Sequence, residues 1–279
     1  MADSTLPFVE LSAGVGIGSP APADWECVAD RPLLVIVGVT GVGKSTALQA
    51  LQDGGFEYDL LPDRRDLTDR LIIPSVQAVR GELLEPVRDR KLRFEYTRAY
   101  REQHAGGMAS ALSQLWIDPE KLSGALLFDG LRGANEVTHA ASLLPLALFV
   151  VLEAPDVVRV SRLMGRGDPF DQIGGEGAEN VVLDYVQHFA DIGAPQANEY
   201  FSHLEEQALL ELVRTGAASA ESLRDSLAIV IEERRNYDPT AASAALLDAA
   251  PLRTIIVDTQ RHGPDYVAAR IIRFVQQYM

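Results

Sequence analysis

Residues 38 to 46 read Gly38-Val39-Thr40-Gly41-Val42-Gly43-Lys44-Ser45-Thr46, a complete GxxxxGK[ST] pattern. The preceding run, residues 33 to 37 (LLVIV), is apolar throughout and typical of a buried parallel strand. The following residues, 45 to 52 (STALQALQ), favour a helix, and two glycines at 54 and 55 signal its end. This succession of strand, loop and helix predicts a phosphate-binding loop.

Each residue type in this loop suits the binding of a nucleoside triphosphate. The glycines allow positive φ angles, so that successive N–H groups point at an anion, and the helix that follows presents its positive end. Lys44 is predicted to reach the β- and γ-phosphates, and the Ser45 hydroxyl to bind Mg²⁺. We therefore predict that ATP and Mg²⁺ are bound here by Gly38, Thr40, Gly41, Val42, Gly43, Lys44, Ser45 and Thr46.

Composition narrows the class of protein. With 279 residues, 47% of them hydrophobic, the chain is long enough to bury a substantial core. A formal charge of −15 makes nucleic acid or an anionic membrane an unlikely electrostatic partner, and the longest apolar run is too short to span a bilayer. The single cysteine, Cys27, excludes an internal disulfide and fits a cytoplasmic protein. The five histidines lack the spacing of a zinc site.

The order of apolar runs predicts the fold class and the domains. Strand-like segments at residues 56–60, 125–129, 146–152 and 254–258 alternate with helical patterns, which indicates an α/β fold with a doubly wound parallel sheet of about five strands. Residues 1–30, rich in glycine and proline, are expected to form a flexible or loosely docked extension. Residues 31–166 and 237–279 would form the nucleotide-binding core, and residues 167–236 a helical lid or cap insertion.

An acid follows the second long apolar run, at Asp129. The carboxyl end of a parallel strand faces the ligand crevice, so Asp129 is predicted to lie beside the phosphate loop and hold Mg²⁺ or its water. An aspartate at a strand end can also be a simple turn former. The arginines between residues 63 and 111 have two readings as well, as ion pairs on a helix surface or as ligands of an anion.

Three further segments, together with the loop, resemble the nucleoside and nucleotide kinase group of P-loop proteins, of which adenylate kinase is a familiar member. The segment FDGLR (128–132) is similar to the DGxPR motif of that group, one residue shorter and without the proline. The segment RLMGR (162–166) matches the RLxxR motif that leads into the ATP lid. The segments ERRNY (233–237) and IIVD (255–258) look like the end of the lid and the last strand.

The resemblance implies roles for several arginines. Arg162 would lie against adenine, Arg166 would contact the phosphates of ATP, and Arg132 would meet the acceptor phosphate. These residues, with Lys44 and Asp129, form the predicted catalytic set. Arg234 and Arg235 both fit the arginine at the end of the lid, while Arg64, Arg65 or Arg70 would contact the acceptor. A mobile lid between Arg166 and Arg234 is also implied.

Two functions follow from these patterns. The first is a kinase that transfers the γ-phosphoryl group of ATP to a nucleotide or another small-molecule acceptor. The second is a regulatory ATP-binding protein or ATPase without such an acceptor, because residues 45–61 (STALQALQDGGFEYDLL) also resemble the start of the P-loop RNase-adapter proteins. The sequence favours the kinase and leaves the acceptor unidentified.

Overall fold

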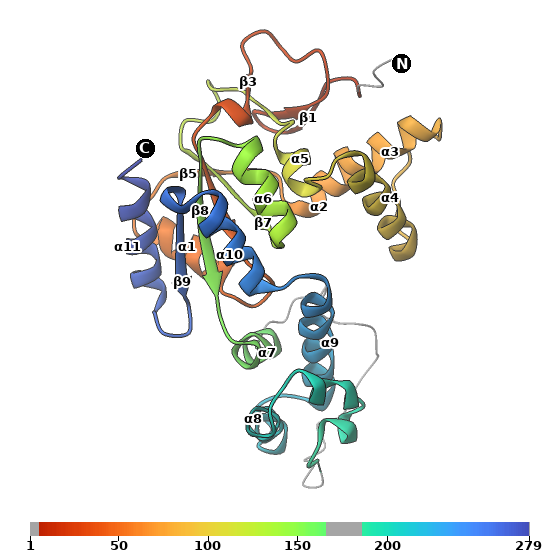
Figure 1. Cartoon of the computed structure of the whole chain (residues 1–279), viewed down its shortest axis with the longest axis vertical. Helices are drawn as coiled ribbons and strands as arrows, with labels where there is room; N and C mark the ends of the chain where they lie inside the picture. The colour runs from red at the N-terminus through yellow and green to blue at the C-terminus, as the bar shows by residue number, and fades with distance from the viewer. Residues whose placement is uncertain (1–5, 166–185, 279) are drawn as a thin grey trace.

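A computed structural model describes residues 6–165 and 186–278 of the chain. Predictions that fall on the intervening residues, among them the phosphate contact of Arg166, lie outside the described residues. Within these ranges the chain forms two sheets and a separate group of helices (Figure 1).

The larger sheet has five strands in the order β5-β7-β4-β8-β9, and every neighbouring pair is parallel. The predicted fold class, an α/β fold with a doubly wound parallel sheet of about five strands, is confirmed. The first apolar run forms the central strand, because a run that is apolar at every position can be buried on both faces. The strands are β4 (Leu33–Val37), β5 (Tyr58–Leu60), β7 (Ala125–Leu131), β8 (Ala147–Glu153) and β9 (Thr254–Asp258).

Helices cover both faces of this sheet, and alternate residues of β4 divide between the two cores. Leu34 and Ile36 pack with α1 (Lys44–Asp53) and α11 (Pro264–Val275). Leu33, Val35 and Val37 belong to the core that holds α5 (Met108–Leu112), α6 (Ala134–Leu143) and α10 (Pro239–Ala249). A short 3₁₀ turn at Pro251–Arg253 connects α10 to β9.

The N-terminal region differs from the prediction of a flexible or loosely docked extension. Residues 9–27 form three strands of a four-stranded antiparallel sheet, in the order β1-β2-β6-β3. Val15 and Ile17 are 2% exposed and belong to the core beside the main sheet. The glycines of this segment therefore serve turns within a sheet. The strands are β1 (Val9–Ser12), β2 (Val15–Ile17), β3 (Glu26–Cys27) and β6 (Trp116–Ile117), with a 3₁₀ turn at Val28–Asp30.

The arginine-rich region is helical, as predicted, but it is broken into pieces. Gly81 ends α3 in a left-handed conformation, with φ +68°, and no helix is assigned to residues 82–89. The interruption turns the chain back, so that α4 packs beside α3 at the edge of the phosphate-loop region. The elements are α2 (Arg64–Leu67), a π-helical turn (Thr68–Ile72), α3 (Ile73–Arg80) and α4 (Arg90–Gln103).

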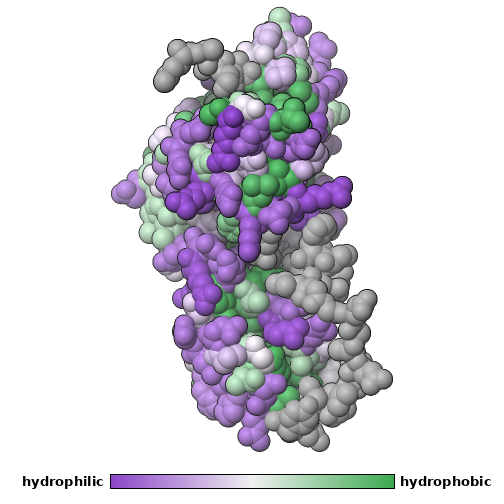
Figure 2. Space-filling model, turned by 90° about the vertical axis from the view of Figure 1, so that its right-hand side faces the viewer, coloured by the Kyte–Doolittle hydropathy of each residue, from purple (hydrophilic) through white to green (hydrophobic). Residues whose placement is uncertain are grey.

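A group of helices beyond the sheet has its own apolar core, to which α7 and the described residues 186–231 contribute. Figure 1 shows these helices as a separate part at the lower end of the molecule, and Figure 2 shows this part as a lobe below the rest. Among the described residues, we find no helix whose length and apolarity would let it cross a membrane. The elements are α7 (Asp156–Met164), 3₁₀ turns at Phe189–Ile192 and Pro195–Glu199, α8 (His203–Arg214) and α9 (Ala220–Asn236).

Candidate nucleotide and acceptor site

The predicted phosphate loop connects the central strand β4 to the N-terminus of α1. Gly41 and Gly43 adopt positive φ angles of +84° and +97°, which only glycine tolerates easily. A Cβ atom on Gly41 would lie 3.1 Å from the backbone of Arg159 in α7, so the glycine also permits close packing. Helix α1 begins at Lys44 without a side-chain cap, which leaves its first N–H groups available to an anion. This conformation suits the phosphates of a nucleotide.

Lys44 lies folded over its own loop. Its Nζ donates hydrogen bonds to the carbonyl oxygens of Gly38, at 2.7 Å, and Val39, at 3.4 Å. Burial and, to a smaller degree, the positive charge of Arg132 lower the Lys44 pKa to about 8, against the opposing effect of Asp129 and Glu233. An incoming phosphate would supply the missing counter-charge. Lys44 is therefore placed to gain more from binding an anion than an exposed lysine would.

The lowered pKa gives a testable pH dependence. In the free protein Lys44 loses its proton near pH 8 instead of 10.5, whereas phosphate binding favours the ammonium form. Binding of Mg-ATP should therefore take up a proton above pH 8, and its affinity should fall as the pH rises, by up to about tenfold per unit. Calorimetry in two buffers of different ionisation enthalpy measures this uptake. The same uptake in Lys44→Ala would contradict its assignment to Lys44.

Asp129 lies beside the loop, although not at the end of its strand as predicted. Strand β7 continues to Leu131, because the Gly38 N–H bonds to the Leu131 carbonyl at 3.2 Å. The register with β4 shifts by one residue across Asp129 and Gly130, an irregularity of the kind that can redirect a side chain. The negative charge of Asp129 raises the Lys44 pKa.

The Mg²⁺ prediction remains untested. Ser45 is exposed at the start of α1, and Asp129 is partly exposed. Among residues 6–165 and 186–278, no group of three or more His, Cys, Asp or Glu side chains is placed to hold a metal. A Mg²⁺ ion bound here would accordingly take most of its ligands from phosphate and water, which is usual for this metal beside nucleotides.

A cavity of about 450 Å³ lies on one side of the loop, where Gly43, Thr46 and Arg162 form part of its lining. Arg162 donates to the carbonyl of Thr259 at 2.8 Å and to that of Gly41 at 3.2 Å. The loop after β9, residues 259–264, forms the opposite wall and includes His262. Sequence reasoning missed this wall, since a short loop after the last strand carries no motif of its own.

A network of buried charges holds the third residue of the phosphate loop. The Glu233 carboxylate, on α9, accepts hydrogen bonds from the Thr40 N–H, at 3.0 and 3.2 Å, and from its hydroxyl at 2.6 Å. It also pairs with Arg132, at 2.8 Å, and with Arg159. Arg159 in turn donates to the Thr40 carbonyl at 2.8 Å and to Asp156 at 2.7 Å. Both polar groups of the Thr40 backbone, the N–H and the carbonyl, are thereby held by hydrogen bonds.

This network was only partly visible in the sequence. The spacing of Asp156 and Arg159 suits an ordinary ion pair on a helix surface, but Arg159 is only 1% exposed. The segment ERRNY (233–237) stands out in the sequence, but nothing in it indicates that Glu233 contacts Thr40, which lies 193 residues earlier. Of the two arginines predicted for the end of the lid, Arg234 pairs with Asp156 and lines a cavity together with residues of the phosphate loop. Arg235 donates to the Tyr200 hydroxyl at 3.2 Å.

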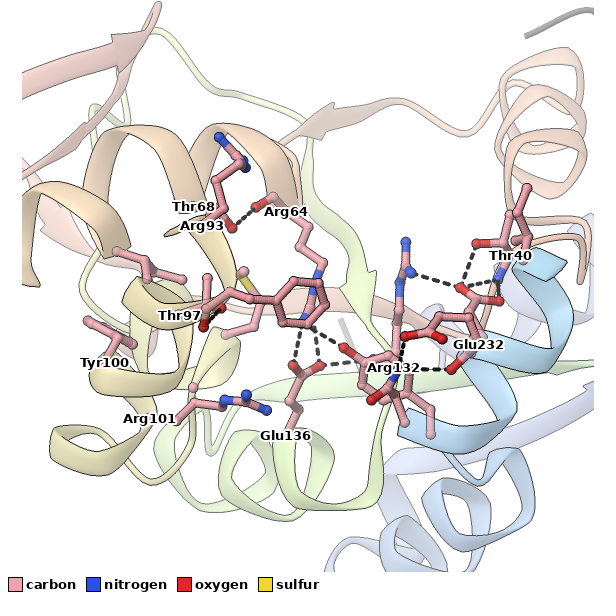
Figure 3. A pocket seen from close by; sticks show the side chains of 18 of the residues that line it. Thr40, Arg64, Thr68, Arg93, Thr97, Tyr100, Arg101, Arg132, Glu136 and Glu232 are labelled. Carbon is pink, nitrogen blue, oxygen red and sulfur yellow. Dashed lines mark hydrogen bonds and ion pairs between the residues drawn. The ribbon is translucent and has the colours of Figure 1, made fainter. Parts of the chain in front are cut away.

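A second cavity, of about 460 Å³, lies on the other side of the loop and is lined by Thr40 and Arg132 (Figure 3). Of the three arginines proposed for the acceptor, Arg64 lines this cavity. Arg65 and Arg70 line a different cavity, and Arg70 donates to the Glu10 carbonyl at 3.0 Å. The cavity is bounded by the arginine-rich helices on one side and by α9 on the other.

Comparisons with known proteins add limited information. No family model and no curated protein matches the chain. Among solved structures, similar chains include an unliganded sugar kinase from Janibacter sp. HTCC2649, with 15% identity over 88% of this chain and 95% of the other, at a TM-score of 0.33. A shikimate kinase from Acinetobacter baumannii with bound shikimate has 15% identity over 89% and 95%, at a TM-score of 0.33.

A protein from Thermus thermophilus is similar over 88% of this chain and 96% of its own, with 17% identity and a TM-score of 0.38. Such scores describe only a loose superposition. The fold assignment therefore rests on the order of the strands and on the phosphate loop between β4 and α1.

Proposed function

We propose that the chain is a kinase that transfers the γ-phosphoryl group of ATP to a small-molecule acceptor with the help of Mg²⁺. The observation that carries this proposal is that more than one cavity borders the phosphate loop: one is lined by Gly43 and Arg162, and another by Thr40 and Arg132. The first would take the base of the nucleotide. The second gives an acceptor access to the end of the phosphate chain.

The side chains present supply what phosphoryl transfer requires, which is positioning and neutralisation of charge. Lys44 and the loop N–H groups would hold the phosphates. Arg132, held in place by Glu233, lines the cavity that would take the acceptor. Ser45 and Asp129 would hold Mg²⁺ through its water, and the ion would neutralise charge on the phosphate oxygens.

The second candidate, a regulatory nucleotide-binding protein, would use the same loop. Such a protein would not need a second cavity beside the loop to bind a small-molecule acceptor. The buried network around Thr40 does not discriminate between the two, because it would also suit a protein whose helical part reports on nucleotide binding. The cavity lined by Arg132 therefore favours the kinase.

Asp129→Asn and Arg132→Ala test the proposal together. In a kinase both side chains meet charge that moves with the phosphoryl group, so each variant should lose more in turnover than in ATP affinity, by at least about tenfold. The measurement is acceptor-stimulated release of ADP, screened over hydroxy acids, sugars and nucleotides, beside dissociation constants for ATP. If no acceptor raises the release of ADP above the rate of slow ATP hydrolysis, the result would favour the regulatory protein.

A further inference from the structure

The charges in the cavity lined by Thr40 and Arg132 (hereafter the acceptor cavity) are not evenly balanced. Arg64 pairs with Glu136 through two hydrogen bonds, at 2.7 and 2.9 Å, and Arg132 pairs with Glu233. The third arginine of the lining, Arg93, pairs with Asp69. These three cations are already neutralised by acids of the protein itself.

The fourth arginine of the lining, Arg101, has no hydrogen-bond or ion-pair partner among the described residues. Figure 3 shows Arg101 extending from α4 into the cavity toward Glu136, without a contact between them. The stem of Arg101 lies against Gly107, where a Cβ atom would come within 3.2 Å of its Cγ. The missing side chain at Gly107 thus leaves room for the arginine to lie along the cavity wall.

At the end of the cavity beside the phosphate loop, two of the three glutamates of the lining are paired with arginines: Glu136 with Arg64, and Glu233 with Arg132 and Arg159. Glu232 is bonded only to the Asn236 amide, at 3.1 Å, among its described contacts. A hydroxyl group of the acceptor could therefore donate a hydrogen bond to Glu232.

Between the two ends the lining is apolar. Ile72, Tyr100 and Met108 are at most 3% exposed and form part of the lining, while Phe94 lies beside the cavity with 52% of its surface exposed. A flat or ring-shaped apolar body would cover these side chains and remove them from water. Arg101 and Glu232 lie at opposite sides of the view in Figure 3, so a ligand that touches both must carry its polar groups at its two ends.

We propose that the acceptor is a small hydroxy acid, with a carboxylate at Arg101, an apolar ring or chain across the middle, and the accepting hydroxyl near Glu232 and Arg132. This inference rests on the proposed kinase function. In the reaction, the hydroxyl oxygen forms a bond to the γ-phosphorus as the bond from that phosphorus to the bridging oxygen breaks. ADP leaves with the electron pair, and the hydroxyl proton passes to Glu232 and then to water.

Benzoate and benzamide are suitable probes, because the two have nearly the same shape and only benzoate carries a negative charge. In saturation-transfer NMR with the full chain, benzoate should bind more tightly than benzamide, and Arg101→Gln should weaken benzoate binding by about tenfold, the loss of one charge-assisted contact. Arg98→Gln is the matched control: Arg98 lies one turn earlier on α4, pairs with Glu102 at 3.3 Å and is outside the cavity.

Equal binding of the two probes, or benzoate binding that survives Arg101→Gln, would overturn the anion site. In the ADP-release screen, a nucleoside monophosphate that stimulates turnover would overturn the hydroxy-acid class, whereas hydroxy acids whose KM rises in Arg101→Gln would support it. Arg101-dependent binding of benzoate without any acceptor-stimulated turnover would uphold the anion site and refute the proposed kinase function instead. The two failures are therefore distinguishable.

Discussion

Lys44→Ala is expected to lower the affinity for Mg-ATP by at least about tenfold, roughly 1.4 kcal/mol, while leaving the protein folded. The hydrogen bonds that the structure gives this side chain go to carbonyls of its own loop, at Gly38 and Val39. Its loss removes the cation that a triphosphate would recruit. Calorimetric titration measures the affinity, and circular dichroism confirms the fold.

Lys91→Ala provides the control for this variant. Lys91 is an exposed lysine on α4 and is outside the linings of the two cavities beside the loop. It should bind Mg-ATP as the unaltered chain does. Unchanged affinity in Lys44→Ala would refute the phosphate-loop assignment, since Lys44 is the lysine that the motif places against the phosphates.

Glu233→Ala is expected to destabilise the protein by about 3 kcal/mol, the usual cost of removing one partner of a buried ion pair. The variant leaves Arg159, only 1% exposed, with Asp156 as its one remaining acid, and it frees the N–H and hydroxyl of Thr40. Denaturant unfolding measures the stability. Hydrogen exchange should also become faster in residues 38–43 of the loop.

The neighbouring residue on the same helix supplies the comparison. Glu232 is exposed and is bonded to Asn236 within its own helix, so Glu232→Ala should change stability by no more than about 0.5 kcal/mol and leave exchange in the loop unaltered. If the two variants lose equal amounts of stability, α9 contributes through helix stability alone, and the contact of Glu233 with Thr40 adds nothing.

The fold was largely predictable because its strands are continuous apolar runs. Residues 33–37 and 254–258 were predicted with the bounds that the structure has, since apolar runs flanked by turn residues leave little freedom. The small antiparallel sheet was not predictable. Its strands β3 and β6 have two residues each, and β6 lies about 90 positions further along the chain than β3, so no local pattern indicates the pairing.

The candidate site divides in the same way. The phosphate loop is a local motif, and its glycines have the positive φ angles that the motif requires. Glu233, Arg159 and Arg101 owe their positions to the packing of helices that are distant in the sequence. In a chain with many arginines and glutamates, an ion pair on a helix surface and a buried network have the same local spacing, so sequence alone cannot separate them.

The contact between Thr40 and Glu233 has a consequence for biosynthesis. The phosphate loop is translated early, but the carboxylate that fixes it comes 193 residues later. At a translation rate of about 5–20 residues per second, the loop would wait on the order of ten seconds or more for this partner. A ribosome-bound chain that ends before α9 would contain the whole GxxxxGK[ST] motif and still lack the side chain that holds Thr40. The nucleotide site is thus completed among the last parts of the molecule, although its motif is among the first to be made.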